Sequence, residues 1–215
     1  MQASRIPILF YILAFALLWT VAPAGAQQEP VQSDHRVEFF IIRDPVSLTL
    51  EQWDEVVAPD PVRLSAYQVA SGFLAGIPFH FERNRDRLSI TEQVDRVVRE
   101  LEYLGYSRED SCYRFDFACW IPSERYSEAR SGRIHQGHGV SGEQNLAIAR
   151  ESARKDAMEE AIREAFRVAY TERNEPLPGT IEGRITWYEI THEGRDPDSG
   201  DYVVDINAWI QITEE

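Results

Sequence analysis

Residues 145–170 read NLAIARESARKDAMEEAIREAFRVAY, and alanine returns in this stretch at every fourth position. At about 100° of rotation per residue, a four-residue repeat stays on one broad side of an α-helix. The repeat consists of Ala149, Ala153, Ala157, Ala161, Ala165 and Ala169. Small side chains let a helix backbone lie close to a flat partner, so the stretch predicts a long helix packed on a β-sheet.

Larger apolar side chains flank the alanines in the C-terminal half of this helix, and charged side chains fill the opposite face. Burial of Met158, Ile162 and Phe166 would stabilise the fold by about 1.5–3 kcal/mol each. Two arginines, Arg150 and Arg154, project into the otherwise apolar side. Such arginines either bind an anion or a partner carboxylate, or lay their stems along the core and reach water, which is the commoner arrangement.

The chain ends in its clearest strand candidate. Over residues 202–212 apolar and polar residues alternate, as in a strand with one buried face. Another strand is expected over 181–192, with a bulge near Trp187 and Tyr188. The acidic stretch 196–201 lacks the glycine and the bidentate glutamate of a calcium loop, and it is interpreted as a hairpin turn.

A polar strand is expected over 126–136, before a glycine-rich stretch, 137–142. This stretch matches G-x-G-x-x-G, the dinucleotide-binding pattern. However, the preceding strand is not an apolar run, and the acidic residue expected about 20 positions on would fall inside the helix. We therefore interpret the glycines as a flexible turn between strand and helix.

The order strand, helix, strand, strand predicts an α+β fold. Residues 123–215 are expected to form a β-α-β-β domain, with the alanine-rich helix on an antiparallel sheet. A smaller α/β part is expected to precede it over 37–122. In that part we expect strands over 37–42, 79–81 and 111–121, and helices over 49–57, 65–76 and 90–104.

Local signals for helix boundaries are strongest in this first half. The helix over 90–104 has Ser89 and Glu92 in the positions of a capping box, and Gly105 as its stop. Pro59 and Pro61 are expected to end the helix over 49–57.

Cys112 and Cys119 are the only cysteines, and in an exported protein such a pair predicts a disulfide. Seven steps of a straight strand would separate their Cα atoms by about 23 Å, so the bond needs a bent segment; two separate thiols are the alternative. His135 and His138 could join the cysteines in a zinc site. Their odd spacing points them to opposite faces of a strand, and no metal or cofactor is predicted.

The N-terminus matches a secretory signal peptide over residues 1–26. A lone arginine and an apolar run precede Ala24 and Ala26, which predict cleavage before Gln27. A retained membrane anchor is the alternative, but a span needs about 20 apolar residues and prolines bracket a shorter run here. Residues 27–36 are expected to be a flexible tail.

Composition excludes some classes of partner and reaction. The formal net charge of −14 disfavours nucleic acid and anionic lipid as partners. The sequence contains no G-x-S-x-G elbow, H-E-x-x-H pair or P-loop, and we expect no enzymatic activity.

Gly137-x-Gly139, the alanine-rich residues 149–161 and YVVDINA at 202–208 together resemble the N-terminal domain of flagellar assembly protein T. They are also similar to related small exported lipoproteins, in which an alanine-rich helix lies on a three- or four-stranded sheet. The resemblance covers about residues 126–212, and it implies a periplasmic, non-enzymatic assembly part. Residues 37–42 and 50–53 are faintly similar to the opening of a peptidoglycan-associated periplasmic family.

The sequence therefore predicts a periplasmic or secreted envelope accessory or assembly protein that binds protein partners and has no membrane span after cleavage. The alternative is a peptidoglycan-binding or cell-wall-modifying protein, which would have a cleft with converging carboxylates and aromatic rings. An unpaired polar strand invites strand addition, and exposed side chains beside it add contacts. The candidate contact residues are Arg130, Arg133, His135, Arg150, Arg154 and Trp209.

Overall fold

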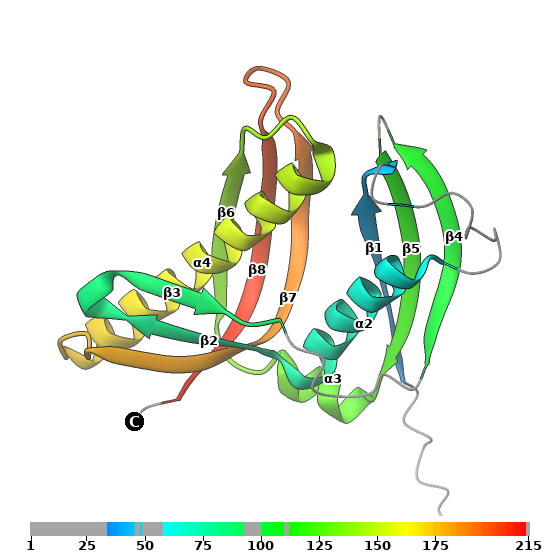
Figure 1. Cartoon of the computed structure of the whole chain (residues 1–215). Coiled ribbons are helices and arrows are strands. Elements are labelled where there is room, and N and C mark those ends of the chain that lie inside the picture. Colours follow the sequence, from blue (N-terminus) through cyan, green and yellow to red (C-terminus); the bar gives the residue numbers. More distant parts are fainter. Residues whose placement is uncertain (1–33, 46–47, 49–57, 93–99, 110–111, 214–215) are drawn as a thin grey trace, which may run out of the picture. The chain divides into compact units, whose positions relative to one another are not determined.

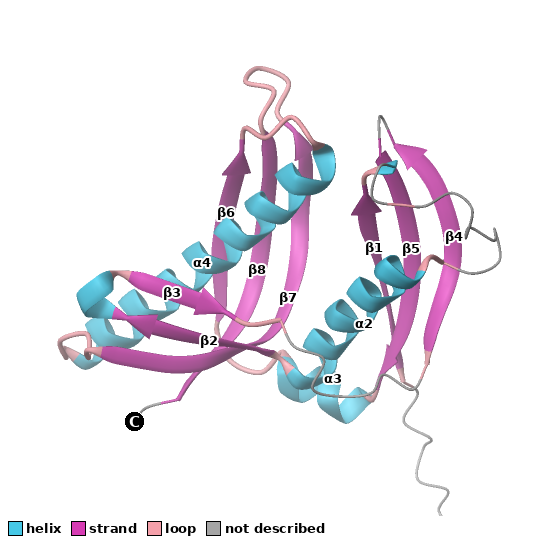
Figure 2. Ribbon diagram, viewed as in Figure 1, coloured by secondary structure: helices cyan, strands magenta, loops and turns pink. Residues whose placement is uncertain are grey.

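The structure is a computed structural model that describes residues 34–45, 48, 58–92, 100–109 and 112–213. The predicted signal peptide and the helix expected over 49–57 lie outside these residues. The described part contains two antiparallel sheets with helices packed on them (Figures 1 and 2). The predicted α+β class is confirmed.

The larger sheet has five strands in the order β3-β2-β7-β8-β6, and all neighbours are antiparallel. Its strands are β2 (Ile77–Glu82), β3 (Arg87–Ile90), β6 (Ile134–Ser141), β7 (Thr180–Arg195) and β8 (Tyr202–Thr213). A 3₁₀ turn, Arg83–Arg85, joins β2 to β3. Helix α4 (Leu146–Arg173) lies on one face, over β6 and β8 (Figure 1), so the predicted β-α-β-β unit is present.

The long helix begins and packs as its sequence predicts. The Asn145 side-chain oxygen accepts hydrogen bonds from the N–H groups of Ala147 at 3.0 Å and Ile148 at 3.2 Å, which is a standard N-cap. The alanines from Ala149 to Ala165 are buried against the sheet, and Met158, Ile162 and Phe166 are buried beside them. The small-residue face is therefore what holds the helix on β6 and β8.

The glycines before this helix are not a flexible turn, and that prediction is wrong. Gly137 and Gly139 belong to β6 and face α4. A Cβ atom at Gly137 would lie 1.9 Å from the carbonyl oxygen of Ala157, and one at Gly139 would lie 1.9 Å from that of Ala153. Glycine is required at both positions because the helix backbone approaches the strand so closely.

The last two strands also follow their predictions, with one addition. The ladder between β7 and β8 shifts register between Ile185 and Trp187, where a bulge was expected, and again between Ile190 and His192. In the turn between the strands, the Asp196 carboxylate accepts the N–H groups of Asp198 and Ser199 at 2.9 and 2.8 Å. The acidic stretch is therefore a hairpin turn, as predicted.

The smaller sheet has the order β1-β5-β4, again antiparallel. Its strands are β1 (His35–Arg43), β4 (Leu101–Glu109) and β5 (Cys112–Ile121), and helix α2 (Asp60–Ala75) packs on it. Val62 and Ala66 of α2 are buried with Phe115 and Phe117 of β5. His35 and Arg36, which were expected to belong to a flexible tail over 27–36, are the first residues of β1; residues 27–33 lie outside the description.

The helix predicted over 90–104 is wrong at both of its described ends. Ser89 and Ile90 belong to β3, and the segment from Leu101 to Gly105 belongs to β4; residues 93–99 lie outside the description. Tyr103 of β4 packs against the rings of β5. Pairing with a distant strand outweighs the local capping signals, as tertiary contacts commonly do.

Prolines open two helices where other structure was expected. Pro59 is the N-cap of α2 and Pro61 lies in its first turn, so α2 begins before the expected residue 65. Pro122 likewise precedes α3 (Ser123–Ala129), which replaces the first part of the strand predicted over 126–136. The first turn of a helix tolerates proline because its N–H groups have no intrahelical acceptor.

The expected division between residues 122 and 123 does not coincide with the division between the sheets. The β2–β3 hairpin comes from the first half of the chain, but β2 pairs with β7 of the second half. The larger sheet is therefore built from both halves.

The predicted disulfide is also wrong, since Cys112 and Cys119 are free and buried. Both lie in β5, which pairs with β1 without a register shift, so the strand has no bend that could bring them together. Burial raises the pKa of Cys119 to about 12, which keeps its thiol protonated.

Candidate functional site

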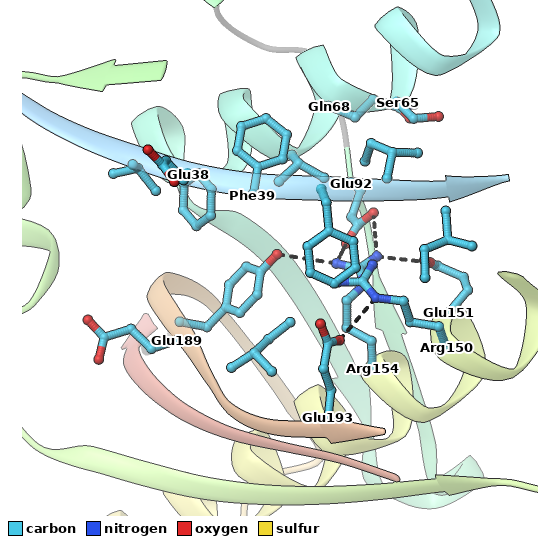
Figure 3. A pocket seen from close by; sticks show the side chains of 18 of the residues that line it. Glu38, Phe39, Ser65, Gln68, Glu92, Arg150, Glu151, Arg154, Glu189 and Glu193 are labelled. Carbon is cyan, nitrogen blue, oxygen red and sulfur yellow. Dashed lines mark hydrogen bonds and ion pairs between the residues drawn. The ribbon is translucent and has the colours of Figure 1, made fainter. Parts of the chain in front are cut away.

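A cavity of about 890 Å³ lies between β1 and the second half of β7. The start of α4 and the middle of α2 complete its walls (Figure 3). Its volume is in the range of pockets that bind small molecules or short segments. It is lined by five glutamates, four arginines and several aromatic rings.

Arg154 lies at the base of this cavity and is buried, with 6% of its surface exposed. Its guanidinium group is 2.7 Å from the Glu92 carboxylate and 2.9 Å from that of Glu151 (Figure 3). The Tyr188 hydroxyl is 3.5 Å away. Arg154 therefore does not reach water, which was the commoner arrangement, and the carboxylates that it binds belong to the chain itself rather than to a partner.

Burial disfavours the charge of Arg154, but Tyr188, Glu92 and Glu151 together hold its pKa well above the usual value. Burial also raises the pKa of Tyr188, so its hydroxyl is neutral at neutral pH and the negative charges beside Arg154 are those of carboxylates. Desolvation works against the ionisation of Glu151, but Arg154 outweighs it and lowers the pKa of Glu151. The buried charge of Arg154 is therefore paired inside the fold.

Arg150 makes the second link across the cavity. Its Nε atom is 3.0 Å from the Glu193 carboxylate, and its guanidinium carbon lies 4.1 Å from the centre of the Phe40 ring in β1. Arg114 of β5 lies 3.8 Å from the same ring centre. Two cation–π contacts therefore fix Phe40 at the cavity wall.

The remaining cavity glutamates are also paired with arginines. Glu189 is 2.9 Å from Arg130, and Glu38 contacts Arg36. A general acid needs a raised pKa, whereas the pKa of Glu151 is lowered. This pairing favours binding over acid–base chemistry in the cavity.

Two buried donors at the cavity have no acceptor within the described part of the chain. They are the indole N–H of Trp187 and the Nε–H of Arg43. An unsatisfied buried donor destabilises a fold by roughly 1–3 kcal/mol, so a ligand that accepts from either group would gain this energy.

The other candidate contact residues lie between α3 and β6, where Arg130 and Arg133 are, in β6 (His135) and in β8 (Trp209). Trp209 is buried at 5% exposure, so the expectation that it is exposed is wrong. Trp187 pairs with it across the strands, and the guanidinium carbon of Arg130 lies 5.0 Å from its ring centre. His135 is also buried; burial, opposed by Glu164, lowers its pKa. Only Arg133 remains well exposed at 57%, 2.5 Å from Glu172.

The outer edge of β6 is covered by its own helix rather than open. The N–H of Gln136 donates to Glu164 at 3.0 Å, and that of His138 donates to Glu160 at 2.6 Å. His138 also contacts Asp205 at 2.7 Å on the exposed face. His135 and His138 point to opposite faces, as predicted, and the described residues contain no group of three metal ligands.

Sequence reasoning missed the residues of β1 and β7 that complete the cavity. Phe40, Tyr188 and Glu193 come together only through the fold, and no local pattern marks them. The usable signal was the pair of arginines on an apolar helix face, since a buried guanidinium requires carboxylates elsewhere in the chain.

Comparison of the chain with protein-family models, with curated proteins and with solved structures finds no match. Among the described helices, none combines the length and the apolar character that crossing a membrane requires.

Proposed function

We propose that this chain is an exported accessory or assembly protein of the bacterial cell envelope, and that it binds a protein partner in the cavity beside β1. The observation that carries the proposal is the pairing of the cavity charges. Arg150 and Arg154 bind Glu193, Glu92 and Glu151, so these groups are engaged in structure and leave an aromatic surface for contact. Export rests on the signal-peptide pattern of residues 1–26.

A role in flagellar assembly is the narrower form of this proposal. It rests on the resemblance of residues 126–212 to the N-terminal domain of flagellar assembly protein T. A deletion strain should then lose motility, and a complemented strain should regain it. Normal swimming of the deletion strain would remove the flagellar part and leave the envelope role.

Peptidoglycan binding is the second candidate, and one observation favours it. A protein that acts only through protein contacts was expected to have no cleft with carboxylates and aromatic rings, yet Phe39, Phe40, Tyr188 and five glutamates line one cavity. Glycans commonly pack on such rings while acidic and basic groups bind their hydroxyls. Sedimentation of the purified chain with insoluble peptidoglycan tests this candidate directly.

Site-specific photocrosslinking in living cells separates the two candidates. A photoreactive residue at Gln68 faces the cavity, whereas one at Leu64, one turn earlier on α2, is exposed and outside it. The protein-contact proposal predicts one envelope protein captured from position 68 and not from position 64. Equal capture at both positions, or sedimentation with peptidoglycan and no protein captured at position 68, would contradict it.

A further inference from the structure

Two open strand edges border the cavity. β1 pairs with β5 on one side, and no strand in the described ranges pairs with its other side. β7 pairs with β2 only up to Ile185; beyond that, residues 187–195 pair with β8 alone. As far as the described residues show, each strand therefore has a length of backbone at the cavity that no other strand pairs with.

Consecutive residues of both strands line the cavity, so it borders the strand edges and not only one face of each strand. All nine residues of β1 and the seven consecutive residues 187–193 of β7 contribute to the lining. A strand face would contribute only every second residue. A strand edge presents alternating N–H and C=O groups, and an extended peptide backbone satisfies both kinds at the strand spacing.

The side chains beside these edges are mainly apolar or already paired. Phe39 is stacked on Phe117, and Phe40 is held by two guanidinium groups. An added strand would place alternate side chains on these two faces. Trp187, with only 4% of its surface exposed, offers a buried N–H that lacks an acceptor among the described residues.

One arginine in the lining, Arg43, makes no close ion pair within the described residues, although its charge helps to lower the pKa of Glu151. Arg36, Arg150 and Arg154 each form an ion pair. Arg43, at the end of β1, contacts the Ser65 hydroxyl instead, and its Nε–H is buried without an acceptor. A carboxylate on the ligand would complement this guanidinium group.

Building on the proposed contact function, we propose that the cavity binds an extended segment of a partner protein, which adds as a strand to the open edge of β1. The segment has an acidic side chain that pairs with Arg43 and apolar side chains that pack on Phe39 and Phe40. Main-chain hydrogen bonds supply affinity, and the Arg43 contact sets the register.

A random dodecapeptide library displayed on phage and selected on the full chain tests this inference. The enriched peptides should share one acidic position among apolar residues. Isothermal titration with the synthetic peptide should show about ten-fold weaker binding to Arg43→Gln, because a charge-assisted hydrogen bond is lost. Arg43→Lys should recover part of that loss. Arg85→Gln, at an exposed arginine outside the cavity, should bind like the parent chain.

Two further measurements are specific to strand addition. N-methylation of every second peptide amide should abolish binding in one register and leave it intact in the other. Amide hydrogen exchange in β1 should slow when the peptide is added. The inference would be overturned if no peptide is enriched, if both N-methylated registers bind equally, or if Arg43→Gln binds unchanged. It would also be overturned if β1 amides are already protected in the free chain, by its own termini or by a second copy.

The two proposals fail in different ways. Capture of a protein at position 68 in cells, without any effect of Arg43→Gln or N-methylation, would retain the cavity as a contact site and remove strand addition. Loss of capture at position 68 would remove the contact function itself.

Discussion

β6 is an edge strand of the larger sheet and β1 is an edge strand of the smaller one. The outer edge of β6 is covered by a helix, whereas the outer edge of β1 is not paired with any described strand. At β6, two glutamates of α4 accept the outward N–H groups of Gln136 and His138. At β1, the outer edge borders a cavity, and no described strand pairs with it. Natural sheets protect edges because open ones invite unwanted pairing. An unprotected edge beside a preformed cavity is therefore a candidate site for functional pairing with a strand of a partner protein.

The protection of β6 depends on how closely α4 approaches it. Glutamates on α4 reach the strand backbone because Gly137 and Gly139 allow the helix to lie directly against the strand. The same alanine and glycine pattern thus packs the core and covers the edge. None of the described helices packs on β1 as closely, and α2 contacts its sheet through larger side chains such as Val62.

The largest expected loss of stability comes from adding a single methyl group where α4 lies against β6. In Gly139→Ala, the new Cβ would lie 1.9 Å from the Ala153 carbonyl oxygen and 2.6 Å from the Ala157 nitrogen. The helix must move away from β6, which should lower the free energy of unfolding by about 3 kcal/mol or more. Urea denaturation followed by circular dichroism measures this loss.

Gly194→Ala is the matched control, because nothing lies within 4 Å of its added Cβ. Its stability should change by no more than about 0.5 kcal/mol. If the two variants are equally stable, the close approach of α4 to β6 is not what the packing requires.

Removal of the buried guanidinium group of Arg154, in the cavity beside β1, should cause the next largest loss in the free energy of unfolding. Arg154→Met leaves Glu92 without its partner, and Glu92 is only 30% exposed. A fully buried pair would lose about 3–5 kcal/mol; partial solvation of Glu92 reduces the expected loss to about 2 kcal/mol. Arg167→Met, at a 73% exposed arginine of the same helix, should lose much less.

The same cluster predicts how stability depends on pH. The pKa of Glu151 is lowered in the folded chain, so the unfolded chain binds its proton first as the pH falls. The stabilisation from Glu151 is complete above its unfolded pKa of about 4.3 and is lost as the pH falls through the folded pKa. Because Arg154 is the main cause of the lowering, Arg154→Met should flatten this part of the stability profile. An unchanged profile would show that another group titrates there.

The sequence predicted the region around the covered edge of β6 better than the region around the open edge of β1. Regular spacing of alanine, glycine and alternating apolar residues from 137 to 212 is a local signal, and it identified α4, β7 and β8. The glycines were assigned to a turn because a sequence pattern shows where flexibility is allowed but not which backbone lies opposite.

The open edge belongs to a sheet in which β1 and β4 both pair with β5. Local sequence patterns do not record pairing between β1 and so distant a segment. Ser89, Glu92 and Gly105 have the spacing of helix signals, yet β3 and β4 form there because β2 and β5 supply partners. Arg150 and Arg154 were recognised as unusual, but Glu193 and Phe40 could be assigned to Arg150 only from the folded chain.

A smaller effect is expected when the covered edge is opened. Glu160→Ala combined with Glu164→Ala removes both acceptors from the β6 backbone. Water replaces them, so the loss of stability should be about 1 kcal/mol. Hydrogen exchange of the Gln136 and His138 amides should become faster, and light scattering should show more self-association. The glutamine substitutions at the same positions keep an acceptor oxygen and should show neither change; exchange rates that stay the same in the alanine variant would contradict the covering role.

The smallest expected effect concerns β5, which pairs with the inner side of β1. Because Cys112 and Cys119 are buried free thiols, a reducing agent should not change the unfolding temperature, whereas breaking a real disulfide would lower stability by about 2–5 kcal/mol.

Titration with a thiol reagent should detect two thiols in denaturant without reductant and almost none in the folded chain, since burial raises the pKa of Cys119 to about 12. Detection of no thiols in denaturant would mean that the cysteines are oxidised, and β5 would then need a bend that its uninterrupted ladder with β1 does not contain. Two free thiols would instead support a straight β5, which holds β1 in place from one side and leaves its other side to the cavity.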